Sequence, residues 1–228
     1  MFGGITLRKN EKRIDMGIRR VITITLLLLL CTFTLVGCGD RKKYSASVGS
    51  EDIVKLSLFT FDGKGESHFG LMNLGHTYLS MENISEEDVT IGKTTLGSGE
   101  EMALGAWSIK SHFGLWYNLE SNYSRLYNKY DGRVSITIGI GREDIDKINE
   151  FIESNDHWGV FKNCSYFALN LYDIVAEESE SIALPLIYTP SYIASKIKKF
   201  DTYEVNKVIS TGETFGYYSN DSFVEYNF

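Results

Sequence analysis

Proline, cysteine and positive charge are all scarce in this chain. Two Pro among 228 residues, together with 43% hydrophobic residues, are not typical of a disordered protein. Three Cys are too few for a disulfide-dense scaffold. The 23 Lys and Arg stand against 30 Asp and Glu, and a net charge of −7 disfavours nucleic acid as the main partner. Aromatic residues are plentiful, with 14 Tyr, 13 Phe and 3 Trp, and the length suits one medium-sized domain.

The N-terminal segment carries positive charge but no hydrophobic run long enough to cross a membrane. Residues 21–36 contain no charged side chain, but these 16 residues fall short of the roughly 20 that a transmembrane helix needs. A basic flank followed by a short apolar stretch indicates a secretory signal peptide, beginning at Met1 or at Met16. The basic residues of this flank are Arg8, Lys9, Lys12, Arg13, Arg19 and Arg20.

The apolar stretch ends in Leu35-Val36-Gly37-Cys38, which resembles the lipobox of bacterial lipoproteins. The resemblance implies cleavage before Cys38 and acylation of its thiol. The protein would then be anchored by lipid to the bacterial cell membrane, on the extracytoplasmic side. An ordinary signal peptide, or a single-pass anchor with an incidental cysteine, remains the alternative.

Cleavage after residue 37 would change the charge and the cysteine count of the chain. Six basic and two acidic residues leave with residues 1–37, so the net charge falls from −7 to −11. Cys31 leaves as well, and Cys164 becomes the one thiol without a lipid. So acidic a chain is not expected to adhere to anionic lipid by charge. The predicted membrane attachment therefore depends on Cys38, with residues 38–53 as lipid anchor and polar tether.

Beyond residue 53, the spacing of apolar residues predicts strands first and helices later, which is typical of an α+β fold. A two-residue alternation predicts strands at 54–60, 75–82, 101–108 and 133–140, with 88–93 as the hairpin partner of 75–82. A three- and four-residue spacing predicts helices at 143–154, 163–178 and 189–200. We expect one domain over 54–200 and a C-terminal extension over 201–228 packed on it.

Cys164 is the first candidate for chemistry. It follows Asn163, a good N-cap, and so begins an amphipathic helix whose unpaired N–H groups and dipole stabilise a thiolate. A thiolate is a nucleophile near neutral pH, and the same N–H groups can hold an oxyanion. An inert cysteine packed inside the helix is the alternative.

A nucleophilic thiol also needs a base, and the chain has four histidines. His76 lies in the predicted strand at 75–82, on its less apolar face, whereas His68 lies in a Gly-rich turn that we expect to be solvated. His112 lies in a segment of mixed character, and His157 lies in the loop that enters the Cys164 helix. No two His have a close helical spacing and no CxxC exists, so neither a metal nor another cofactor is expected.

Four segments together resemble papain-like NlpC/P60 and CHAP-type cysteine hydrolases in a circularly permuted order. The segments are GHTYLSMEN (75–83), HFGLWYNLES (112–121), HWGVFKNCSYFALNLYD (157–173) and PLIYTPSYIASKI (185–197). In permuted relatives the His strand comes first and the Cys helix later, and here His76 precedes Cys164 by 88 residues. The resemblance implies an antiparallel sheet packed against the helix that bears Cys164.

The same resemblance implies roles for individual residues. Cys164 would attack an amide or ester carbonyl, and His76 would take the thiol proton and later protonate the leaving group. A third polar group usually orients the His in this family. The candidates for this third or oxyanion group are Asn163, Asn118, His112 and Thr90.

The sequence thus predicts a membrane-anchored thiol hydrolase that cleaves amide bonds, with peptidoglycan or another peptide as substrate. The Asp-Cys-Ser-Gly form common in peptidoglycan peptidases is absent around Cys164, which leaves the substrate open. A binding lipoprotein without turnover and an acyltransferase or thioesterase acting on lipids are the alternatives. The aromatic residues of one region would line a substrate groove or pack in the core; they are Trp107, Phe113, Trp116, Tyr117 and Tyr123.

Overall fold

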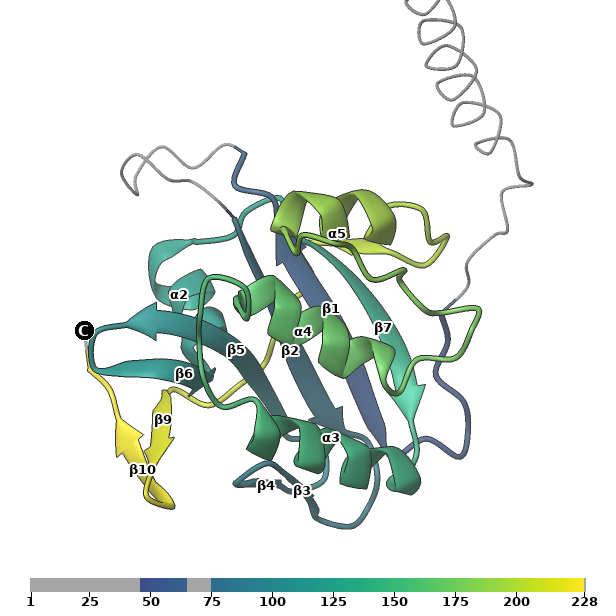
Figure 1. The fold of residues 1–228 in the computed structure, drawn as a ribbon. Helices are drawn as coiled ribbons and strands as arrows, with labels where there is room; N and C mark the ends of the chain where they lie inside the picture. The colour runs from purple at the N-terminus through teal and green to yellow at the C-terminus, as the bar shows by residue number, and fades with distance from the viewer. Residues whose placement is uncertain (1–45, 65–74, 228) are drawn as a thin grey trace, which may run out of the picture. The chain divides into compact units, whose positions relative to one another are not determined.

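The computed structural model describes residues 46–64 and 75–227, which form a large antiparallel sheet covered by helices (Figure 1). The predicted α+β class is therefore confirmed. The sheet has eight strands in the order β10-β9-β6-β5-β2-β1-β7-β8, and β3 and β4 form a separate two-stranded sheet. The predicted signal peptide, the lipobox with Cys38, and His68 lie outside the described residues.

The bounds of the elements follow the chain. The strands are β1 (Val54–Phe61), β2 (His76–Asn83), β3 (Val89–Ile91), β4 (Thr94–Leu96), β5 (Glu101–Ile109), β6 (His112–Tyr117), β7 (Val134–Ile140), β8 (Glu204–Val205), β9 (Gly216–Ser219) and β10 (Ser222–Glu225). The helices are α2 (Leu119–Tyr127), α3 (Arg142–Ser154), α4 (Cys164–Asp173) and α5 (Pro190–Ile197).

The central strands β1 and β2 are buried on both faces. Their register pairs Leu58 with Leu79 on the face that joins the main hydrophobic core. On the other face Phe59 pairs with Tyr78, and the two rings stack with centroids 5.1 Å apart. Alternate residues of each strand therefore supply two different cores, one aliphatic and one aromatic.

Helices α3, α4 and α5 lie in front of the sheet in Figure 1, and α2 lies behind its β5 side. Helix α4 packs on β2 and β5, and it begins where the sequence predicts, because the side chain of Asn163 accepts a hydrogen bond from Tyr166 N at 3.0 Å. Helix α5 begins in the same way, with Thr189 Oγ1 accepting from Tyr192 N at 3.2 Å and with Pro190 in its first turn.

Two predictions about these elements are wrong. Residues 88–93 do not pair with β2, because β3 turns back on β4 and the neighbours of β2 are β1 and β5. Helix α4 ends at Asp173 rather than continuing to residue 178, and Ile174 is 40% exposed instead of packed inward. A short alternating segment shows that a strand forms but not which strand it pairs with.

Three parts of the fold have no counterpart in the sequence prediction. Strand β6 and helix α2 occupy the segment of mixed character around residues 112–127. Strands β9 and β10, from the C-terminal extension, continue the sheet beyond β6, and β8 adds to its other edge. Among the described residues no helix is long and apolar enough to cross a membrane.

Candidate active site

Cys164 is the first residue of α4 and is partly accessible to solvent. The backbone N–H groups of a first helical turn have no partner within the helix, and they give this end a partial positive charge. The carboxamide of the preceding residue, Asn163, also donates to Tyr188 O at 3.2 Å and to Val160 O at 3.4 Å. The loops before α4 and before α5 are therefore joined directly beside Cys164.

His76 is the first residue of β2, and a hydroxyl pair holds this end of β2 against the start of α4. Thr77 Oγ1 and Ser165 Oγ, from the residues that follow His76 and Cys164, lie 3.0 Å apart and are buried. Gly75 precedes His76 with φ +74°, where a side chain would overlap Phe61 O. The turn into β2 therefore requires glycine, and it places the imidazole at the Cys164 end of α4.

The thiol of Cys164 and the imidazole of His76 shift each other's pKa in opposite directions. Burial alone would lower the pKa of His76, but the charge of Cys164 and hydrogen bonds to Cys164 and Glu120 raise it to about 9. Burial alone would raise the pKa of the Cys164 thiol, but the charge of His76, with hydrogen bonds from His76, the Thr77 backbone and Ser165, lowers it overall. The two groups therefore favour a thiolate–imidazolium pair.

The third member of this arrangement is Glu120, from α2. Its Oε1 lies 2.9 Å from His76 Nε2 and accepts a hydrogen bond from Trp107 Nε1 at 2.6 Å. An indole N–H can only donate, so Oε1 acts as an acceptor, and we assign the proton of this ring nitrogen to His76. The other ring nitrogen, Nδ1, is then available for the hydrogen bond with Cys164.

Glu120 is fully buried, and its second oxygen, Oε2, has no hydrogen-bond partner among the described residues. A buried carboxylate that is only partly satisfied destabilises a fold. Space for it comes from Gly105 in β5, where a Cβ atom would overlap Glu120 Oε1 and lie 3.3 Å from His76 Nε2. A glycine in the middle of a strand thus allows the carboxylate to reach the imidazole.

Aromatic rings surround His76. The ring of Trp107 lies 4.1 Å from that of His76, and those of Tyr78 and Tyr130 lie within 6 Å, at 5.7 and 5.9 Å. These rings keep water from the His76–Glu120 contact and so strengthen it. Of the aromatic residues singled out from the sequence, Trp107 lies at the site, Trp116 and Tyr117 are core residues, and Phe113 is 55% exposed.

The sequence candidates for the third group have other partners. Asn118 accepts from Ala103 N at 3.0 Å, and Thr90 bonds Thr95 at 3.0 Å on an exposed hairpin. His112 stacks on Tyr217 with centroids 4.5 Å apart. His157, one of the four histidines surveyed as a possible base, is exposed in the loop before α4. Asn163 caps the Cys164 helix through Tyr166 N. Glu120 itself carries no local signal, because its contact with His76 spans 44 residues.

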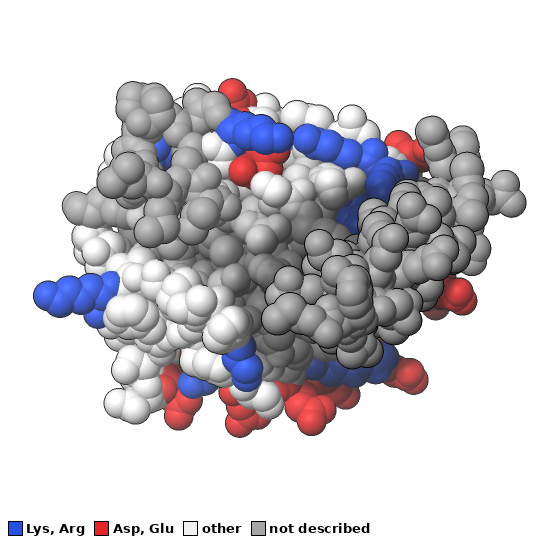
Figure 2. Space-filling view, turned by 45° about the horizontal axis from the view of Figure 1, so that its top comes forward, with Lys and Arg blue, Asp and Glu red and all other residues white. Residues whose placement is uncertain are grey.

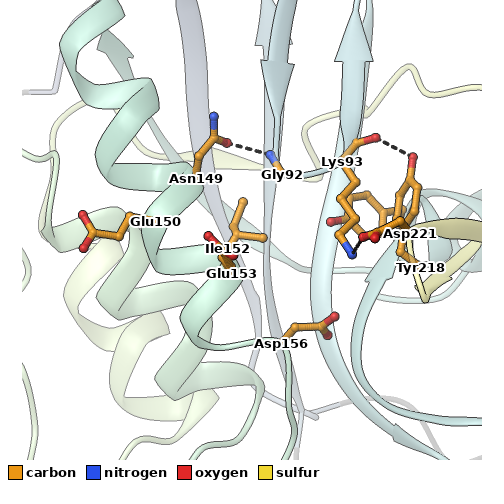
Figure 3. Close-up of a pocket in the computed structure, with 10 residues that line it drawn as sticks. Gly92, Lys93, Asn149, Glu150, Ile152, Glu153, Asp156, Tyr218 and Asp221 are labelled. Carbon is orange, nitrogen blue, oxygen red and sulfur yellow. Dashed lines mark hydrogen bonds and ion pairs between the residues drawn. The ribbon is translucent and has the colours of Figure 1, made fainter.

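A cavity of about 430 Å³ lies apart from these residues, between the end of α3 and two hairpins (Figure 3). Lys93, in the β3–β4 turn, pairs with Asp221 of the β9–β10 turn at 2.6 Å, and Tyr218 donates to Lys93 O at 2.7 Å. Three more carboxylates line it, from Glu150, Glu153 and Asp156. Among the described residues no group of three or more His, Cys, Asp or Glu is arranged to hold a metal ion.

Comparison with protein-family models, curated proteins and solved structures finds no match for this chain. The functional argument therefore depends on the geometry of Cys164, His76 and Glu120.

Proposed function

We propose that this protein is a thiol hydrolase that cleaves amide bonds, with Cys164 as nucleophile, His76 as general acid and base, and Glu120 as the residue that orients His76. One observation carries the proposal: a cysteine at a helix N-terminus is coupled to a histidine whose other nitrogen lies 2.9 Å from a buried carboxylate. Nucleophile, base and orienting group in this order are the arrangement that activates a weak nucleophile.

The reaction follows from the charges of the pair. The Cys164 thiolate attacks the carbonyl carbon, and backbone N–H groups at the start of α4 stabilise the oxyanion. The C–N bond then breaks as the His76 imidazolium gives its proton to the leaving amine, which leaves an acyl-thioester on Cys164. Neutral His76 takes a proton from water, whose oxygen releases the acyl group as a carboxylic acid and restores the thiolate.

In the same proposal the fold is a circularly permuted papain-like arrangement anchored by lipid on Cys38. The support is an antiparallel sheet whose strand β2, with His76, precedes the Cys164 helix in the chain and packs against it. The lipid anchor is supported by the lipobox-like Leu35-Val36-Gly37-Cys38 alone. The substrate would face the extracytoplasmic side, where cell-wall peptides and other peptides are accessible.

The test compares the soluble chain 39–228 with its Cys164→Ala variant. This chain contains every described helix and strand, and therefore the cores they form. Incubation with purified peptidoglycan, and separately with an unfolded protein, should release peptides only with the unmodified chain.

Iodoacetamide labelling at varied pH adds a readout that needs no substrate. The midpoint for Cys164 should lie below the ordinary thiol value and should rise towards it in His76→Ala. An ordinary midpoint in the unmodified chain, with no peptide released, would indicate a binding lipoprotein without turnover.

A further inference from the structure

Two loops beside Cys164 expose an unusual set of large apolar side chains. One loop precedes α4 and the other precedes α5. We call the two segments together the apolar loops. Their exposed apolar side chains are those of Val160 (75% exposed), Phe161 (90%), Leu184 (48%), Leu186 (fully exposed) and Ile187 (76%). Exposed apolar residues are ordinary when scattered, but a contiguous group marks an interaction surface.

The two loops form one surface because the same side chain joins them. The amide nitrogen of Asn163 donates to Val160 O in the first loop and to Tyr188 O in the second. The rings of Tyr166 and Tyr188 also meet, with centroids 5.1 Å apart. Phe161 and Ile187 are each one residue from these contacts, so the apolar loops adjoin the residue that precedes Cys164.

The two segments that contain the apolar loops carry a charge opposite to that of the whole chain, between flanking acidic residues such as Asp173 and Glu180. Residues 157–172 and 181–200 contain no Asp or Glu, although the net charge of the protein is −7. Four lysines lie within these segments: Lys162, Lys196, Lys198 and Lys199. Figure 2 shows Lys and Arg side chains along the upper edge with acidic side chains among them, and further acidic side chains along the lower edge. An apolar surface whose own segments carry lysines but no acidic residue fits an anionic lipid surface.

The start of the described chain lies close to the second loop. Ser47 N donates to Glu180 Oε1 at 3.1 Å, and Leu184 follows Glu180 by four residues, at most about 14 Å of chain. Cys38 precedes Ala46 by eight residues, whose reach is at most about 29 Å. A lipid on Cys38 would thus hold the domain close enough for the apolar loops to touch the same bilayer.

We infer that the apolar loops insert into an anionic phospholipid bilayer and seat the Cys164 end of α4 at the membrane surface. The apolar side chains protrude from loops, so they can insert between the lipid molecules of a bilayer. The lysines then lie at the level of the headgroups. The proposed contact with the membrane does not require that the protein is an enzyme. If it is the proposed thiol hydrolase, the contact would also place its substrate at the membrane surface.

The experiment uses the chain 39–228, which lacks the lipid site, and phosphatidylcholine vesicles with and without phosphatidylglycerol. The chain should float with the vesicles that contain phosphatidylglycerol, and more weakly as salt is raised. Phe161→Ser with Leu186→Ser should lower the partition constant at least roughly tenfold, because each side chain loses its transfer from water. Val208→Ser is the matched control, since Val208 is 74% exposed outside both loops.

Three results would overturn the inference. The first is no flotation with any vesicle, and the second is equal flotation of the double variant and the control. The third is a dimer in sedimentation that the double variant dissociates, which would assign the apolar loops to a second copy. Iodoacetamide labelling of Cys164 in the same samples separates the proposals, because an ordinary thiol midpoint with intact flotation refutes the hydrolase and leaves the membrane surface standing.

Discussion

Glu120→Gln removes one buried negative charge beside His76 while keeping the shape of the side chain. The glutamine oxygen can still accept from Trp107 and from His76, so the geometry should persist. The pKa of His76 is about 9, against an ordinary value of 6.5, with Cys164 and Glu120 both raising it. A difference of this size corresponds to roughly 3 kcal/mol in favour of the imidazolium.

Without the Glu120 charge, the pKa of His76 should fall below about 9, because that charge is one of the causes that raise it. The sign follows from the chemistry: the imidazolium is the form that protonates the leaving amine, so activity is lost as the pH rises through the pKa of His76. The alkaline limit of hydrolysis should therefore move to lower pH. The Cys164 thiolate loses part of its counter-charge, and its labelling midpoint should move up towards the ordinary thiol value.

The same variant should change the thermal midpoint only slightly, because the lower pKa of His76 removes some stabilisation near neutral pH while a second effect opposes it. Glu120 is fully buried with one oxygen unpartnered, and neutralising such a group removes a desolvation cost. Nitrogen NMR of the histidine side chains measures the pKa of His76 directly, and calorimetry measures the midpoint. Glu180→Gln, at a buried acid remote from Cys164, is the control. A large loss of stability with an unmoved His76 pKa would show that Glu120 is a structural residue, and the proposed role would be refuted.

Two further changes test the surroundings of the site. Gly105→Ala places a Cβ atom against Glu120 Oε1 and should lower both the pKa of His76 and the rate of hydrolysis. The control is Gly139→Ala, whose Cβ atom meets the carboxylate of Asp52 and should change neither quantity. Equal effects of the two variants would contradict the reasoning. Asn163→Ala removes the cap of α4 and should cost about 1–2 kcal/mol, a fall of roughly 2–8 °C in the thermal midpoint, and an unchanged midpoint would exclude a stabilising cap.

The elements that carry Cys164 and His76 could be predicted because each depends on local pattern. Asn163 before an amphipathic stretch predicts the start of α4, and alternation after Gly75 predicts β2. The contact between the two elements is not local, and their proximity was an implication of the family resemblance.

Glu120 could not be predicted, because three separate features place it. Helix α2 had to form in a segment without clear periodicity, pack behind β5, and find a glycine at position 105 to reach His76. Asn118, two residues earlier, was a candidate, but its left-handed backbone (φ 59°) and its bond to Ala103 N turn the chain into α2 instead. Sequence spacing alone says nothing about which residue of a short helix faces a strand from another part of the chain.

The energetics of the three groups argue that they serve chemistry rather than folding. The aliphatic core between the sheet and α3, α4 and α5 is built without any of them. Apolar side chains at Glu120 and His76 would fill the same aromatic surroundings without a buried charge, and such exchanges are often neutral or stabilising. The low dielectric that makes this charge costly is also what lets Glu120 and Cys164 raise the pKa of His76 to about 9. An apolar replacement of Glu120 that kept Trp107 in place should thus lower the pKa of His76 and weaken the thiolate–imidazolium pair.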